Sequence, residues 1–215
     1  MGKGEMKVQN RRHSRDTEPY SGWQILWKMG MPLLYVLAFL SGIVGIICNG
    51  IISHYWSHLP TPMCFLYSRT PSTIGFTSFG SAVANCHWVT YGGTVGVILL
   101  FLCALLYFIK VRSRDDPGMF LYLLLICVIL ATIFLLAVSC TLAEGMRVTC
   151  ASMGINSANN KGESCYDKLE KRVQQYSLPV STASMVQAAM YSFWGSTVFS
   201  AFIAWFHLAL YFRSF

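Results

Sequence analysis

The sequence predicts an all-α membrane protein, namely a four-helix transmembrane bundle with two disulfide-stapled extracellular loops. First, residues 33–52, 89–109, 119–142 and 188–212 contain no Asp, Glu, Lys or Arg. Each stretch has about 20 residues or slightly more, the length that carries a helix across a hydrocarbon core of roughly 30 Å. Second, charged residues make up only 12% of the chain, against about 25% in an average globular protein. Third, four of the eight cysteines fall in the two long connections.

These uncharged stretches have the character of transmembrane helices. A buried helix of a soluble protein normally shows a polar face, and these stretches do not. Backbone polar groups in lipid must be satisfied within the segment, and the short alternating segments of a β-barrel are not visible. The other segments are a basic cytoplasmic tail with an interfacial helix (1–32), a first outer loop (53–88), a cytoplasmic loop (110–118), a second outer loop (143–187) with a short helix at 166–176, and a cytoplasmic end (213–215).

The distribution of basic residues predicts the orientation. Six of the 16 lie in the N-terminal tail, three in the connection at 110–118 and one at the C-terminus, whereas the two long loops share the other six. The positive-inside rule therefore places both termini in the cytoplasm. We expect an integral protein of the plasma membrane with both long loops outside the cytosol. The connection at 110–118 is so short that spans two and three should be antiparallel neighbours.

The cysteines of the two long loops predict disulfides. Cys64 and Cys86 lie in the first loop, and Cys150 and Cys165 lie in the second. Outside the cytosol such bonds persist, and each contributes roughly 2–4 kcal/mol by restricting the unfolded loop. Four cysteines allow three pairings, which sequence alone does not distinguish. We favour Cys64–Cys86 and Cys150–Cys165, because each closes a loop of moderate size, and a cross-loop pairing stays open.

Two groups of histidines are functional candidates. His54 and His58 are four residues apart, so they share one helical face, as metal sites require. They flank Tyr55 and Trp56 at the end of span one, where amphipathic rings favour the membrane interface, and we expect this interfacial role rather than a metal site. His207 is the ionisable residue inside a span. Because no span carries a carboxylate, we expect it to donate or accept a hydrogen bond with a neighbouring helix rather than relay protons.

Small residues recur at four-residue spacing in three of the spans. Such spacing lets helix backbones approach closely. We expect this helix-packing seam to pack the bundle itself, or else to receive a partner's transmembrane helix. Its members are Ala38, Gly42, Gly92, Gly96, Ser196, Ser200 and Ala204.

The N-terminal tail predicts a lipid contact. Arg11, Arg12 and Arg15 would attract anionic lipid at the cytoplasmic face, at about 1 kcal/mol each. Ser14 follows two arginines at a spacing that basic-directed kinases favour, and its phosphorylation would oppose that attraction. The sequence shows no nucleotide loop, catalytic triad or paired carboxylate. We therefore expect no enzyme activity, no cofactor, no metal and no nucleic-acid partner.

The cysteine layout resembles a known family. The matching features are the segment 63–67 after span one, Cys86 before span two, Ser139-Cys140, Gly145 and Cys150 after span three, Ser164-Cys165, and the Gln187-Ala-Ala and Ser192-Phe-Trp194 segments of span four. This pattern is similar to the transmembrane protein 179 family of four-span proteins and covers most of the chain beyond the tail. The resemblance implies the four-span fold and little about activity. The longer basic tail and the very short C-terminus depart from that family.

Claudin-type proteins share the layout of four spans and two outer loops. Their first loop carries a Gly-Leu-Trp segment and a close pair of cysteines. Here Trp56 is present, Gly-Leu-Trp is absent, and Cys64 and Cys86 are far apart. The likeness is one of architecture, which says little about function.

These observations predict an accessory or interaction subunit that associates laterally with another integral membrane protein, such as a channel or receptor. The reasons are the sizeable outer loops, the small-residue seam and the lack of polar groups inside the bundle. A claudin-like role in cell–cell adhesion is one alternative. A pore made by oligomerisation is another.

Overall fold

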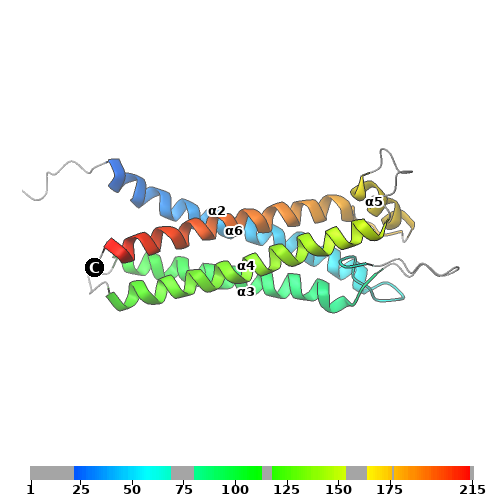
Figure 1. Cartoon of the computed structure of the whole chain (residues 1–215), viewed down its shortest axis with the longest axis horizontal. Coiled ribbons are helices and arrows are strands. Elements are labelled where there is room, and N and C mark those ends of the chain that lie inside the picture. Colours follow the sequence, from blue (N-terminus) through cyan, green and yellow to red (C-terminus); the bar gives the residue numbers. More distant parts are fainter. Residues whose placement is uncertain (1–21, 69–79, 113–117, 154–163, 176, 214–215) are drawn as a thin grey trace, which may run out of the picture. The chain divides into compact units, whose positions relative to one another are not determined.

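The computed structural model describes residues 22–68, 80–112, 118–153, 164–175 and 177–213, and over these residues the secondary structure is helical, apart from turns and one isolated bridge. The helices are α2 (Gly22–Ser57), α3 (Val83–Arg112), α4 (Gly118–Ser152), α5 (Cys165–Gln175) and α6 (Thr182–Arg213) (Figure 1). The chain divides into two units, Met1–Leu33 and Leu34–Phe215. The first contains the start of α2, including Pro32. The second contains every contact described below.

Four of these helices are long and apolar enough to cross a membrane. The stretches that qualify are Gly30–Ser57, Val83–Ile109, Phe120–Ser152 and Thr182–Phe212. The predicted all-helical class and the four membrane-length helices are therefore confirmed. Helical structure also continues into segments predicted as loops. At 1.5 Å per residue, the 35 residues of α4 extend about 52 Å, well beyond a hydrocarbon core of roughly 30 Å.

In the second unit, α4 packs against both α3 and α6, and α5 packs against α6 (Figure 1). This arrangement agrees with the expectation that spans two and three are neighbours. Side chains place α2 against α3 and α6, because a Cβ built on Gly42 would meet Val97 of α3 and Ser196 of α6. Each long helix therefore has two neighbours, as in a four-helix bundle.

The ring of Phe193 fills the centre of the bundle. It is fully buried, and it fits only because two facing residues are glycines. A Cβ on Gly93 of α3 would lie 2.8 Å from Cε1 of this ring, and one on Gly45 of α2 would lie 3.0 Å from its Cδ1. Glycine lowers helix propensity at these two positions, but it allows the helices to pack closely around an aromatic side chain.

The predicted small-residue seam lies inside the bundle. Gly92 packs against Val138 of α4, and Gly96 packs against Leu135. The hydroxyl of Ser196 donates a 2.8 Å hydrogen bond to the Ala38 carbonyl. Of the two uses predicted for the seam, the structure shows bundle packing. The seam members are Ala38, Gly42, Gly92, Gly96, Ser196 and Ser200, which are buried, and Ala204, which is half-buried.

The expectation that the bundle lacks internal polar groups is wrong. Asn49 is fully buried and donates a 2.8 Å hydrogen bond from Nδ2 to Oγ1 of Thr90. Ser139 and Thr197 share a hydrogen bond of 3.0 Å between α4 and α6. The predicted interhelical bond of His207 is confirmed, because its Nε2 lies 2.9 Å from the hydroxyl of Tyr35 on α2. Such pairs satisfy polar groups that lipid cannot.

Candidate interaction surface

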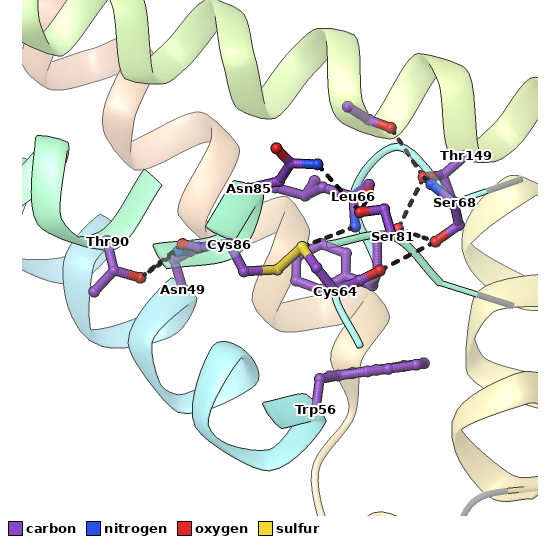
Figure 2. Close-up of a disulfide and its surroundings, with 12 residues drawn as sticks. Asn49, Trp56, Cys64, Leu66, Ser68, Ser81, Asn85, Cys86, Thr90 and Thr149 are labelled. Atoms are coloured by element: carbon purple, nitrogen blue, oxygen red, sulfur yellow. Dashed lines mark hydrogen bonds between the residues drawn. A yellow bond between two sulfur atoms is a disulfide. The ribbon is translucent and has the colours of Figure 1, made fainter. Parts of the chain in front are cut away.

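The described parts of the two long loops fold onto the helix ends, and we call residues 58–68, 80–82, 164–175 and 177–181 the cap. In its first part, Cys64 and Ser81 form an isolated antiparallel bridge with hydrogen bonds of 3.0 and 2.9 Å. The Cys64–Cys86 disulfide ties this bridge to the first turn of α3, with Cα atoms 5.7 Å apart (Figure 2). Gly80 has φ +140°, and a Cβ there would lie 2.7 Å from that of Met63. Glycine is therefore required beside the bridge.

Helix α4 clamps this segment through Thr149. The Thr149 hydroxyl accepts a 3.1 Å hydrogen bond from the Ser68 amide (Figure 2). It donates a 2.8 Å bond to the Phe65 carbonyl. The Tyr67 amide donates to the Gly145 carbonyl at 3.1 Å. The Gly145 position is tightly packed, since a Cβ there would lie 3.1 Å from side-chain atoms of Leu66 and Tyr67. The loop is thus bonded to the helix as well as to itself.

The second part of the cap is built around α5. The Cys150–Cys165 disulfide joins the last turn of α4 to the first residue of α5, with Cα atoms 5.4 Å apart. The structure thus joins the four loop cysteines in the two pairs that the sequence favoured. Helix α5, Cys165–Gln175, agrees closely with the helix predicted at 166–176.

A capping box begins α5. The Asp167 amide donates to the Ser164 hydroxyl oxygen at 3.1 Å, and the Ser164 amide and hydroxyl both donate to the Asp167 carboxylate, at 3.2 and 2.8 Å. This reciprocal pattern satisfies donors that a helix N-terminus leaves free. The hydrogen bonds from the Ser164 hydroxyl and amide lower the pKa of Asp167. The cap therefore contains a carboxylate whose ionised form supports its fold.

A side chain of this region also satisfies backbone groups at the N-terminus of α6. Glu170 of α5 accepts hydrogen bonds from the Ala183 amide and the Ser181 hydroxyl, both of 3.2 Å. A carboxylate at a helix N-terminus is favoured by the helix dipole. Because Leu169 and Val173 of α5 are also buried, this short helix is held by both apolar and polar contacts.

One apolar cluster connects the cap to the bundle. Trp56 is fully buried and donates a hydrogen bond of 3.2 Å from its indole nitrogen to Oγ1 of Thr182. Burying a Phe or Leu side chain contributes about 1.5–3 kcal/mol. Cap and helix ends therefore fold as one core. The buried members of the cluster are Ile52, Trp56, Cys64, Phe65, Leu66, Cys86, Val89, Val138, Leu142, Met146, Leu169, Val173, Val186, Ala189 and Phe193.

The exposed side of this region is polar and carries both signs of charge. Arg147 on α4 makes a bidentate ion pair with Glu144, with N–O distances of 2.6 and 2.7 Å. Asp167, Lys171 and Gln174 of α5 are exposed. A surface of this kind can read a partner through complementary charge, although an exposed ion pair adds little to stability.

The described histidines, cysteines and carboxylates do not form a metal centre of three or more ligands. Within residues 22–68, 80–112, 118–153, 164–175 and 177–213, no group of three or more His, Cys, Asp or Glu side chains could hold a metal ion. Ser14, the predicted phosphorylation site, lies outside the described residues, as do the arginines beside it.

The sequence signals for the cap differ in strength. Ser164-x-x-Asp167 before a polar helix is a capping-box pattern that the sequence alone displays. The roles of Ser68 and Thr149 carry no such signal, because these residues lie 81 positions apart and neither belongs to a motif.

Comparison with models of known protein families, with curated proteins and with solved structures finds no match to this chain.

Proposed function

We propose that this protein is a non-enzymatic subunit of a membrane complex, which associates laterally with another integral membrane protein such as a channel or receptor. It presents the cap to that partner. The observation that carries the proposal is that the described parts of both long loops form one bonded structure on the helix ends. A surface that is already ordered loses little conformational entropy when it binds.

The proposal includes an orientation with both termini in the cytoplasm and the cap outside the plasma membrane. Basic residues are concentrated in the tail and the short connection, as the positive-inside rule requires of cytoplasmic segments. Disulfides such as Cys64–Cys86 persist in oxidising surroundings. An epitope tag inserted in the first loop should be reached by antibody on intact cells, whereas a tag on the N-terminus should require permeabilisation.

The internal packing of the seam decides which surface gives the complex its specificity. Because Gly42, Gly92 and Gly96 are buried against the chain's own helices, a partner's transmembrane helix would meet the bulky outward-facing side chains instead. Such apolar faces do not distinguish strongly between a helix and lipid. The polar cap is therefore the part that selects the partner.

The test is purification of the tagged full chain from cells in mild detergent, preceded by crosslinking of intact cells and followed by mass spectrometry. The wild type should recover one larger membrane protein. Lys171→Glu, which reverses a charge on exposed α5, should lower that recovery several-fold, and Lys171→Arg should not. Recovery of lone monomers from the wild type and from Lys171→Arg would reject the proposal. Enrichment at contacts between two expressing cells without any recovered partner would instead favour the adhesion alternative, and current in reconstituted bilayers would favour the pore.

The basic tail adds a separate expectation. Arg11, Arg12 and Arg15 should hold the tail at anionic lipid, and a phosphate on Ser14 should release it. Binding of the purified protein's tail peptide to vesicles with and without phosphatidylserine tests this, with a Ser14-phosphorylated peptide as the comparison.

A further inference from the structure

A cavity of about 250 Å³ lies between the end of α2 and the start of α3, and three imidazoles line it. They belong to His54, His58 and His87, out of five histidines in the whole chain. The other lining side chains that can form hydrogen bonds are the hydroxyls of Ser53, Ser57, Thr90 and Tyr91. None of the lining residues is Asp, Glu, Lys or Arg. The cavity is therefore rich in imidazole nitrogens and has no Lys or Arg that would repel a metal ion.

The hydrogen bond of His58 determines which of its ring nitrogens is available. Nδ1 of His58 lies 2.8 Å from the backbone carbonyl oxygen of His54. A carbonyl oxygen only accepts, so in the neutral ring Nδ1 carries the proton and Nε2 keeps its lone pair. The same carbonyl also accepts a 2.9 Å hydrogen bond from the Ser57 hydroxyl, so both side chains cap the last turn of α2. Metal-ligating histidines have the same arrangement, with the far nitrogen bonded to a carbonyl that fixes the ring.

The second imidazole lies next to the first. The ring centroids of His54 and His58 are 4.2 Å apart, as the four-residue spacing at a helix end allows. Imidazole nitrogen suits Zn²⁺, Cu²⁺ and Ni²⁺. A water molecule takes about 30 Å³, so the cavity has room for several around an ion.

We propose that this cavity binds a divalent transition-metal ion of the Zn²⁺ and Cu²⁺ class through Nε2 of His58 and a ring nitrogen of His54, with water in the remaining positions. Among the described residues no third His, Cys, Asp or Glu completes the set. The site is therefore open and exchangeable, unlike the four-ligand sites that hold zinc structurally. A bound ion links the last turn of α2 to His58, the residue that follows the helix, and so stabilises the junction between α2 and the cap.

The experiment is titration of the full chain in detergent with Cu²⁺, followed by electron paramagnetic resonance, with Zn²⁺ added as a competitor. The wild type should show hyperfine splitting from two imidazole nitrogens, and Zn²⁺ should remove it. His54→Gln is the decisive variant, because the carbonyl that holds His58 belongs to the backbone and is kept. Apparent affinity for copper should fall at least about tenfold in His54→Gln and in His58→Gln, and should stay unchanged in the matched variant His87→Gln.

Three results would overturn the proposal. One is a copper signal in His54→Gln that equals the wild type, which would place the ion elsewhere. Another is splitting from a single nitrogen in the wild type. The third is an equal loss in His87→Gln, which would contradict the assigned pair of ligands. Thermal unfolding without metal distinguishes loss of a metal ligand from loss of the hydrogen bond between His58 and the His54 carbonyl. His54→Gln keeps that bond and should unfold like the wild type.

Discussion

Replacing Thr149 by Val tests whether α4 holds the cap closed. Valine keeps the shape of threonine and removes its hydroxyl. In the wild type this hydroxyl accepts from the Ser68 amide at 3.1 Å and donates to the Phe65 carbonyl at 2.8 Å. The Phe65 carbonyl keeps a partner in the variant, because the Ser68 hydroxyl also donates to it at 2.8 Å. The Ser68 amide is the group that loses the acceptor found in the structure.

The magnitude follows from that single lost acceptor. A buried donor left without a partner costs about 1–3 kcal/mol, and Ser68 and Thr149 are both fully buried. We take about 2 kcal/mol as the expected loss. Since 1.4 kcal/mol is a tenfold change in an equilibrium constant, the segment should open about 30 times more often in Thr149→Val.

Amide hydrogen exchange of the full chain in detergent measures this opening. The best reporters are the amides of Tyr67 and Ser81, whose own acceptors, the carbonyls of Gly145 and Cys64, stay in place in the variant. The Gly145 carbonyl loses only the Thr149 hydroxyl, which lies 2.9 Å from it. Thr141→Val is the matched control on the same helix. Its hydroxyl donates only to the Ala137 carbonyl, four residues earlier, at 2.7 Å. Losing such a local bond should change stability by less than about 0.5 kcal/mol.

Two outcomes would refute the reasoning. If Tyr67 and Ser81 exchange at the wild-type rate in Thr149→Val, the Thr149 hydroxyl does not hold the segment. If Thr141→Val accelerates exchange as much, the effect comes from a weakened α4 and not from the clamp.

Two further predictions concern the bundle and α5. Gly93→Ala brings a Cβ to 2.8 Å from the Phe193 ring, so it should cost about 1–3 kcal/mol and lower the thermal unfolding temperature, whereas Gly195→Ala, whose Cβ meets nothing closer than 3.9 Å, should not destabilise. The pKa of Asp167 is lowered by its hydrogen bonds from Ser164, so its contribution to α5 is complete above the ordinary Asp pKa and is lost as pH falls through the lowered value. Exchange of the α5 amides should rise over that acidic range in the wild type and stay flat in Asp167→Asn, and an identical pH profile in both would contradict the assignment.

The number and class of the helices could be predicted because charge in lipid is costly. An uncharged run of about 20 residues is the pattern that a membrane-spanning helix requires. The same pattern does not predict where a helix ends, because a helix can continue beyond the hydrocarbon core. Glu144 and Arg147 pair on the continued surface of α4, where they satisfy each other three residues apart. The charge pattern thus marks the edge of the span and not the end of the helix.

The packing partner of the small residues could not be predicted from their spacing. A glycine every four residues permits close approach whether the facing helix belongs to the same chain or another. The packing of Gly92 against Val138 and of Gly96 against Leu135 shows that the approach is internal. Similarly, an average over an apolar stretch conceals single polar residues such as Asn49, whose Nδ2 is bonded to Thr90 and whose Oδ1 has no hydrogen-bond partner among the described residues.

The continuity of the apolar cluster determines how the cap can act. Phe65 and Leu66 of the cap belong to the same buried cluster as Phe193 in the bundle. Opening the cap would expose the side chains of Phe65 and Leu66, which costs about 1.5–3 kcal/mol each. The loss of hydrogen bonds would add to this cost. These buried contacts favour the closed form over the open one. A partner that recognises the cap would therefore bind the closed form, and the binding free energy would not be reduced by the entropy cost of ordering the loops.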